Sequence, residues 1–371
     1  MRPVLNIVGL TIVFSMVYLV AWPVSIKPVA WDAPVNLGFV GDFDTNTKLD
    51  SFSKMTMGDL SGPEAAVHDS KGNLVATSHE GWIVRWAPGQ LQAQKWVNVG
   101  GRPLGIDFDA DGNLWIANAY IGLMKLTPDG ELSTVLTEVD GVAIQYADDV
   151  AVAANGKVYF SDASTRFSAK ASKSTLEASL LDIMEHSDNG RIIEFDPVKN
   201  VAHVVKSNLT FANGVAADPS GDYIYFAETG EYRVWRMALT GPDAFQSHVI
   251  IDNLPGFVDN VHTGLNGRIW LGLTSPRAKI IDDLAGEPFW RKIIQRFPKS
   301  MRPTIEPYGA VIAINKEGDV LENLQSPSGV VYATTGAAES AEYLYVTSLT
   351  APFIARYKKT DLLIQSTSKS G

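Results

Sequence analysis

The chain has 371 residues, of which 46% are hydrophobic, so it can bury a large core. It holds no cysteine, which excludes thiol catalysis, zinc-thiolate sites and disulfide bonds. The net charge is −10 and no Lys/Arg-rich block is present, which argues against a nucleic-acid partner.

An apolar stretch from Val4 to Trp22 is about long enough to cross a bilayer. Arg2 precedes it, whereas Lys27 is soon followed by acidic residues, and this asymmetry favours a cytoplasmic N-terminus and an exported body. We therefore expect residues 1–22 to be an uncleaved membrane anchor, with the body on the periplasmic or lumenal side. A cleaved signal peptide is the alternative. Residues 23–60 are predicted to be a linker and lead-in segment.

From residue 61 to residue 360 one pattern recurs: a short strand, a tight turn with a glycine, and an apolar strand that returns. The clearest copy runs from Phe257 to Leu273 and turns at Asn266-Gly267. Repeats of this length that read as strands and turns predict an all-β fold, a six-bladed β-propeller. Residues 361–371 are predicted to be a flexible C-terminal tail.

Each repeat has an equivalent position, which we call the register position, eight residues before its turn glycine. The six residues there are Glu64, Leu104, Asp148, Asn213, Asp259 and, more weakly, Ser328. Equivalent positions on successive blades face one central channel, so the four side chains that carry a carboxylate or a carboxamide would converge. Such hard oxygen donors, with Asp149 and Asn260 beside them and no histidine cluster, indicate a calcium site. The alternative is that these polar residues only line a wet channel.

Two steps between repeats are too long for one blade, so each must carry an insertion. Residues 165–189 contain an amphipathic helical pattern, Leu176 to Met184, and residues 275–308 contain Phe289 to Phe297, which is apolar with basic residues interleaved. We expect both insertions to cap the mouth of the channel. For the second, contact with a membrane is the alternative.

Other motifs restrict the chemistry further. Asp107 to Gly112 is similar to the start of a helix-loop-helix calcium loop, but it lies between two strand patterns and is expected to be a β-turn. His262 lies three residues after Asp259, so we expect it to point into the blade and to be structural. The absence of HxH and HExxH patterns excludes zinc proteases. The absence of a GxSxG pattern argues against a serine hydrolase of the common kind.

Several motifs occur together in a familiar order. They are Gly62-Pro-Glu64, Phe211-Ala-Asn-Gly-Val215, Leu254-Pro-Gly-Phe-Val-Asp-Asn260 and Ser348-Leu-Thr-Ala-Pro-Phe-Ile354. As a set, over roughly residues 60–358, they resemble the strictosidine synthase-like proteins, the branch that includes the adipocyte plasma membrane-associated proteins. This branch belongs to the wider gluconolactonase, senescence marker protein and paraoxonase superfamily.

The resemblance implies a six-bladed propeller with calcium in its tunnel and, in many members, hydrolysis of lactones or aryl esters. The family's metal-binding Glu matches Glu64, its fourth-blade Asn matches Asn213, and its Asp-Asn pair matches Asp259 and Asn260. Another family Asn falls on Asp148, which adds negative charge to the site. Where the paraoxonase branch has a catalytic histidine this chain has Leu104, and the catalytic glutamate of true strictosidine synthases has no clear match.

We therefore expect a membrane-anchored, calcium-dependent hydrolase of lactones or aryl esters acting on a small-molecule substrate. Its expected metal ligands are Glu64, Asp148, Asn213, Asp259 and Asn260. Asp259 or Asp148 would be the general base for water, and calcium would polarise the ester carbonyl. Two alternatives stay open: a non-catalytic binding propeller with structural calcium, and a strictosidine synthase-like condensing enzyme.

Overall fold

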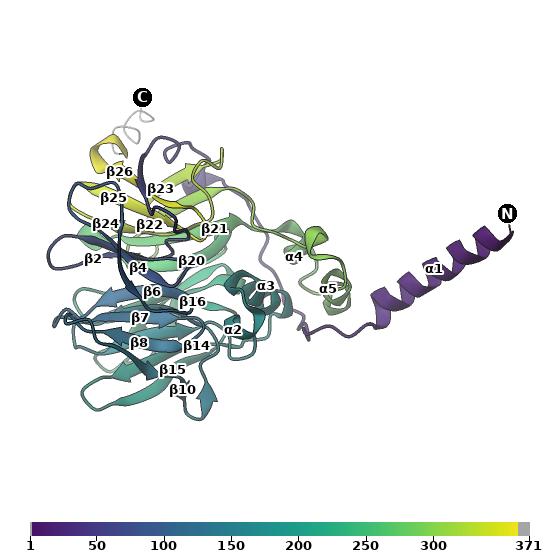
Figure 1. Ribbon diagram of the computed structural model, residues 1–371, viewed down its shortest axis with the longest axis horizontal. Coiled ribbons are helices and arrows are strands. Elements are labelled where there is room, and N and C mark those ends of the chain that lie inside the picture. Colours follow the sequence, from purple (N-terminus) through teal and green to yellow (C-terminus); the bar gives the residue numbers. More distant parts are fainter. Residues whose placement is uncertain (1, 363–371) are drawn as a thin grey trace.

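The computed structural model describes residues 2–362, without the side chains of residues 2–5, 8 and 12. Its body contains six four-stranded antiparallel sheets, from which helix α1 projects (Figure 1). The prediction of an all-β, six-bladed propeller is confirmed. Most of the predicted C-terminal tail, residues 363–371, lies outside the described part of the chain.

Each sheet is one blade, and its strands run in sequence from the channel outward, except in the sixth. Blade one comprises β2 (Ala66–His68), β3 (Leu74–Thr77), β4 (Trp82–Trp86) and β5 (Gln94–Asn98). Blade two comprises β6 (Pro103–Phe108), β7 (Leu114–Asn118), β8 (Gly122–Leu126) and β9 (Leu132–Leu136). Blade three comprises β12 (Ala147–Val152), β13 (Val158–Asp162), β14 (Gly190–Asp196) and β15 (Val201–Leu209). A small hairpin, β10 (Glu138–Val139) with β11 (Val142–Ala143), precedes blade three.

Blade four comprises β16 (Ala212–Ala217), β17 (Tyr223–Glu228), β18 (Arg233–Ala238) and β19 (Ser247–Ile251). Blade five comprises β20 (Gly256–Thr263), β21 (Ile269–Pro276), β22 (Gly309–Ile314) and β23 (Val320–Ser326). Blade six comprises β24 (Thr334–Glu339), β25 (Tyr343–Ser348), β26 (Phe353–Lys358) and, as its outermost strand, β1 (Ser53–Thr56).

The outermost strand of blade six comes from the N-terminal side of the chain. Thr56 of β1 pairs with Phe353 of β26, so residues far apart in sequence close the ring. Met55 is buried there beside Ile354. The propeller thus takes one strand from the segment that was predicted to be a linker.

Glycines let strands of neighbouring blades approach closely. A Cβ atom on Gly105 would lie 2.1 Å from Asp149 Oδ1, and one on Gly272 would lie 2.1 Å from the backbone of Thr335. The side-chain-free positions therefore make room for the next blade around the channel.

The inner strands share an irregularity close to the channel mouth. In β6, β12, β16, β20 and β24 the pairing register shifts just before the regular ladder begins, for example between Ala147 and Val150. A β-bulge inserts an extra residue and re-aims its side chain. The bulges surround the register positions of blades two to five and Thr335 of blade six.

This geometry corrects the sixth repeat of the sequence analysis. Gly336 lies within β24 and is not a turn glycine, and Ser328 precedes the strand. The equivalent residue is Thr335, two positions before Ala337, where regular pairing begins. The repeat was misread because its hairpin turns at residues 340–342, which contain no glycine.

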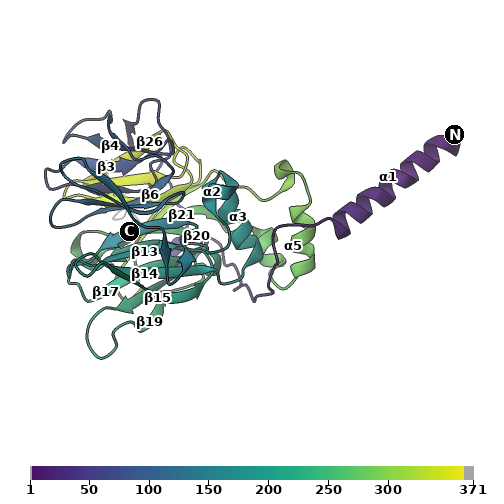
Figure 2. The same cartoon turned by 60° about the horizontal axis from the view of Figure 1, so that its bottom comes forward.

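Both insertions leave the propeller at the same end and carry helices (Figure 2). The first, between β13 and β14, contains α2 (Ala169–Ser172) and α3 (Thr175–Glu185). The second, between β21 and β22, contains α4 (Lys279–Asp283), α5 (Pro288–Gln295) and a short 3-10 turn, η4 (Lys299–Met301). Three further 3-10 turns are η1 (Gly41–Phe43), η2 (Thr229–Glu231) and η3 (Leu265–Gly267).

Helix α1 (Arg2–Ala21) covers most of the predicted membrane anchor. Within the residues that the structure fully describes, no helix is long and apolar enough to cross a membrane.

Candidate functional site

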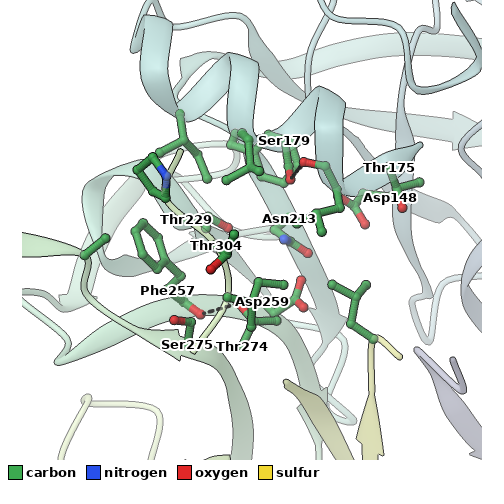
Figure 3. Close-up of a pocket in the computed structure, with 18 of the residues that line it drawn as sticks. Asp148, Thr175, Ser179, Asn213, Thr229, Phe257, Asp259, Thr274, Ser275 and Thr304 are labelled. Carbon is green, nitrogen blue, oxygen red and sulfur yellow. Dashed lines mark hydrogen bonds between the residues drawn. The ribbon is translucent and has the colours of Figure 1, made fainter. Parts of the chain in front are cut away.

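Four of the five predicted ligands line one pocket at the end of the channel that carries the insertions. This pocket of about 730 Å³ is bordered by Glu64, Asp148, Asn213 and Asp259, which come from four different blades (Figure 3). All four side chains are buried. The register position therefore brings carboxylate and amide oxygens to one place.

Burial and mutual repulsion make the carboxylates reluctant to ionise. Burial raises the pKa of Asp148 well above its ordinary value, and the nearby charges of Glu64 and Asp259 raise it further. The pKa of Asp259 is raised in the same way, by burial and then by Glu64, while a hydrogen bond from Asn213 opposes the shift. Without a compensating cation, these acids hold protons at pH values where exposed acids have lost them.

Glu64 has a positive partner that the sequence analysis did not predict. Nη2 of Arg102 donates to its Oε2 at 3.0 Å, and both side chains are at most 4% exposed. Burial raises the pKa of Glu64, and the Arg102 charge opposes that rise. Arg102 lies two residues before Leu104, the register position of blade two, and immediately before β6.

Asn260 takes a different place from the other predicted ligands. It does not border the pocket; its Nδ2 donates to the backbone oxygen of Glu64 at 3.0 Å. The hydroxyl of Thr335 donates to the same oxygen at 2.6 Å. Asn260 thus joins blade five to blade one at the level of the candidate ligands.

The donor set fits a hard cation. The side-chain oxygens of Asn213 and Asn260 are buried and have no hydrogen-bond partner, which is costly unless something positive meets them. In the described part of the chain, no three acidic, histidine or cysteine side chains lie close enough to form a metal cluster by themselves. A cation here would therefore need amide, water or substrate oxygens besides carboxylates, as calcium accepts.

The wall above the polar floor is largely apolar and aromatic. Tyr146, Phe211 and Phe257 border the pocket from blades three, four and five, each two residues before the register residue of its strand. Helix α3 adds Leu176, Leu180 and Ile183, whereas α4 adds Ile281. Because the three aromatic residues share one spacing from the register position, a search of the sequence at that spacing could have predicted this aromatic wall.

Other expected positions are resolved as follows. Gly112 N donates to Asp109 O at 3.0 Å, so the Asp107 to Gly112 segment ends in a β-turn, as expected. Leu104 is buried but does not border the pocket. His262 borders a different cavity, at the opposite mouth of the channel, so the expectation that it points into the blade is wrong. The bulge between Val258 and Val261 breaks the strand alternation on which that expectation rested.

Comparison with known proteins agrees with the fold. A family model described as strictosidine synthase matches residues 148–242, and one described as strictosidine synthase-like, N-terminal, matches residues 41–86. Strictosidine synthase-like 6 of Arabidopsis thaliana is 31% identical over 307 residues, which cover 81% of this chain and 80% of that protein. Adipocyte plasma membrane-associated protein of Bos taurus is 28% identical over 359 residues, which cover 91% of this chain and 85% of that protein.

Solved structures share the propeller at much lower identity. A gluconolactonase of Xanthomonas campestris aligns with a TM-score of 0.58 at 12% identity and covers 83% of this chain and 93% of its own. Regucalcin, a calcium-binding protein of Agrobacterium tumefaciens, aligns with a TM-score of 0.55 at 15% identity and covers 84% and 92%. These likenesses show the fold, and the 31% identity to strictosidine synthase-like 6 over 81% of this chain shows the family: the chain belongs to the strictosidine synthase-like family of β-propeller proteins.

Proposed function

We propose that this protein is a calcium-dependent hydrolase of lactones or aryl esters. The observation that carries the proposal is the meeting of Glu64, Asp148, Asn213 and Asp259 at the floor of an otherwise largely apolar pocket. A hydrolase of this kind needs a polar centre for the ester carbonyl and an apolar wall for the acyl or aryl group. The pocket offers both within one cavity.

Calcium is the cation that the donor set favours. Carboxylate and amide oxygens without thiolate or histidine ligands suit a hard divalent ion. The solved propellers that share this fold include one described as a calcium-binding protein and one described as a gluconolactonase, which supports both halves of the proposal. Glu64, Asp148, Asn213 and Asp259 would hold the ion, with Asn260 beside them. When bound, calcium would supply a Lewis acid for the substrate carbonyl.

The protein's own residues would handle the proton and the orientation of the substrate. Asp259 would accept a proton from the attacking water while the water oxygen bonds to the carbonyl carbon, and that proton would pass to the leaving oxygen as the ester bond breaks. Asn213 borders the pocket with Asp259 and lowers the pKa of its carboxyl group, which favours the ionised form that accepts a proton. Burial raises the pKa of Tyr146 well above its ordinary value, so its hydroxyl stays a hydrogen-bond donor in the pocket wall.

The proposal is tested with the purified full chain and a panel of water-soluble lactones and phenyl esters, each assayed with and without a calcium chelator. Turnover that stops on chelation and returns with added calcium is the expected result. Turnover that survives complete chelation would contradict it. Calcium binding without turnover of any substrate would favour a binding propeller, and condensation of an amine with an aldehyde would favour the synthase-like alternative.

We further propose that residues 1–22 anchor the protein, with the N-terminus in the cytoplasm and the propeller on the extracytoplasmic side. The apolar stretch and the charge asymmetry around it support this, and so does the membrane-associated name of the animal relatives. In the same proposal the two insertions cap the pocket mouth, since both contribute to its wall.

A further inference from the structure

The second insertion presents large apolar side chains to solvent. Phe289 is 49% exposed, Trp290 is 52% exposed and Met301 is 66% exposed. The two aromatic rings contact each other edge to face, with centroids 5.5 Å apart. We call this group, together with Lys292 and Lys299, the outer face of the second insertion. Phe289 and Trp290 thus form an exposed apolar pair, and Met301 is exposed on the same insertion; exposed apolar groups of this kind mark a surface that another body covers.

The charge of this segment is opposite to that of the chain. Residues 288–304 contain five basic and no acidic side chains, although the whole chain has a net charge of −10. Arg291 and Arg296 are buried and bind backbone oxygens, whereas Lys299 is 72% exposed and pairs with Glu177 of α3. Aromatic and aliphatic side chains accompanied by lysines are typical of a surface that lies against lipid headgroups.

Helix α1 is fixed beside this face. The Arg296 guanidinium donates to the backbone oxygens of Leu19 and Trp22 at 2.8 and 2.6 Å, and the Tyr18 hydroxyl donates to Arg296 O at 3.2 Å. Figures 1 and 2 show α1 leaving the molecule on the side where α5 lies. The surface of the second insertion and the helix therefore meet at one point.

The exposed side chains of α1 indicate whether lipid or a protein partner covers this surface. They include Leu10, Phe14 and Val17, which are 71%, 75% and 57% exposed. With Met16 and Tyr18, also exposed, they spread over about half of the helix circumference. A lipid phase can contact so broad an apolar surface, and it also provides anionic headgroups for the lysines of the outer face.

A groove connects this side of the molecule with the candidate site. It lies between α3 and residues 299–304 and measures about 770 Å³ when the space open to solvent is counted; Leu181, Met184, Lys299 and Arg302 border it. It shares part of its wall with the pocket, namely Leu176, Leu180, Ile281, Pro303 and Thr304. An apolar chain lying in the groove would therefore reach toward the floor carboxylates.

We propose that the outer face of the second insertion rests on a lipid bilayer. Phe289, Trp290 and Met301 insert among the headgroups, and Lys292 and Lys299 meet lipid phosphates. The groove beside α3 opens at this surface, so the hydrolysed compounds carry an apolar chain drawn from the lipid phase. This last step rests on the proposed hydrolase function, whereas the contact with lipid does not.

The chain's lack of cysteine allows a direct test. Trp290→Cys and Met301→Cys are prepared in the full chain and labelled with an environment-sensitive fluorophore. Two controls carry the label elsewhere: Lys170→Cys lies on exposed α2 at the same end of the propeller, and Val198→Cys lies in the β14–β15 turn at the opposite end. Each protein is mixed with phosphatidylcholine vesicles, with and without phosphatidylglycerol, that contain lipids with a nitroxide near the headgroup.

The proposal predicts a blue shift and nitroxide quenching for labels at 290 and 301, and neither effect at 170 or 198. Phosphatidylglycerol should increase the effect, and Lys292→Glu combined with Lys299→Glu should remove that increase. Equal signals at all four positions, or no quenching at 290 and 301, would overturn the proposal and leave a protein partner as the occupant of this face. Because no substrate is used, the outcome is independent of whether the chain hydrolyses esters.

Discussion

Glu64 and Asp259 border the same pocket but differ in what neutralises them. Glu64 pairs directly with the Arg102 guanidinium at 3.0 Å, whereas the pKa of Asp259 is lowered by a hydrogen bond from Asn213 and only to a smaller extent by the more distant charge of Arg102. Loss of one negative charge therefore has different consequences at the two positions. Glu64 acts chiefly as a fixed oxygen donor, and Asp259 is the better candidate to take a proton.

We expect Asp259→Asn to lower kcat by about 10²–10⁴-fold, because an amide keeps an oxygen for calcium but cannot accept a proton. Glu64→Gln should instead raise the calcium concentration needed for half-maximal activity, so that excess calcium restores part of the rate. Steady-state kinetics over a calcium titration separate the two effects. Identical, calcium-insensitive losses in both variants would show that the metal is structural.

His262 gives a second prediction at the residue scale, on stability. Burial lowers its pKa to about 4, and its Nε2 has no hydrogen-bond partner. Between about pH 6.5 and pH 4 the unfolded chain binds a proton that the native state excludes, so native stability falls as the pH falls, by about 3 kcal/mol in total.

His262→Gln should remove this contribution. Urea unfolding of both proteins across that pH range gives the difference directly, and other titrating groups cancel in the comparison. A difference that does not change between pH 6.5 and pH 4 would show that the imidazole is accessible to protons in the native state.

At the scale of the elements, the position of the inner-strand bulge relative to the turn determines which register positions can be predicted from the sequence and which are missed. The fixed spacing to the turn glycine identified Asp148, Asn213 and Asp259, because the bulge in each of their strands lies at the same distance from its turn. It also identified Glu64, which comes just before β2 at the same spacing. In blade six the hairpin has no turn glycine, and the same rule selected Ser328 in place of Thr335. Spacing thus predicts equivalent positions only while every repeat keeps its turn residue.

Contacts between blades cannot be predicted from the spacing of residues within each repeat. The Arg102–Glu64 ion pair joins two blades, and the Asn260 bond to Glu64 O crosses between blades five and one. Such contacts depend on how neighbouring sheets are placed around the channel, which no single repeat encodes. The positions of both residues were visible in the sequence, but their partners were not.

Helix α3 and the groove beside it lead to a prediction about substrate length. Leu181 borders the groove but not the pocket, so Leu181→Trp should fill the groove and leave the floor open. We expect kcat/KM for p-nitrophenyl decanoate to fall by about tenfold or more, since each displaced methylene is worth about 1 kcal/mol or more, while p-nitrophenyl acetate is nearly unaffected.

The matched control for this experiment is Lys170→Trp, which adds the same side chain to an exposed position on α2. It should leave the ratio of the two rates unchanged. Equal losses for both esters in Leu181→Trp would mean that the substitution disturbs the pocket itself and that the groove does not hold the acyl chain.

At the scale of the whole molecule, ring closure depends on four residues from the N-terminal side. Met55 of β1 is 2% exposed and packs with Trp86 and Ile354. Met55→Ala should lower the free energy of unfolding by about 2–5 kcal/mol, because it leaves a cavity at the seam. Ser53→Ala, exposed on the same strand, is the control. Denaturant unfolding of the two variants tests this, and equal stabilities would mean that β1 contributes little to closure.

Membrane attachment is also a property of the whole chain. If residues 1–22 anchor it, the protein should stay in the membrane fraction after alkaline carbonate washing, and the propeller should be digested only by protease added from the extracytoplasmic side. Release of the body into the soluble fraction, with a new N-terminus near residue 30, would show that the segment is a cleaved signal peptide.

The pairing of β1 with β26 also determines when the protein can finish folding. Thr56 meets Phe353, 297 positions later, so β1 leaves the ribosome long before its partner exists. At about 5–20 residues per second, this interval lasts roughly 15–60 s. During that time blade six is incomplete, and β1 lacks the strand with which it pairs. During synthesis the propeller is therefore open and exposes an unpaired strand edge that can associate with other chains. A ribosome that stalls before residue 353 leaves a chain that cannot form the β1–β26 pair and so cannot close the ring.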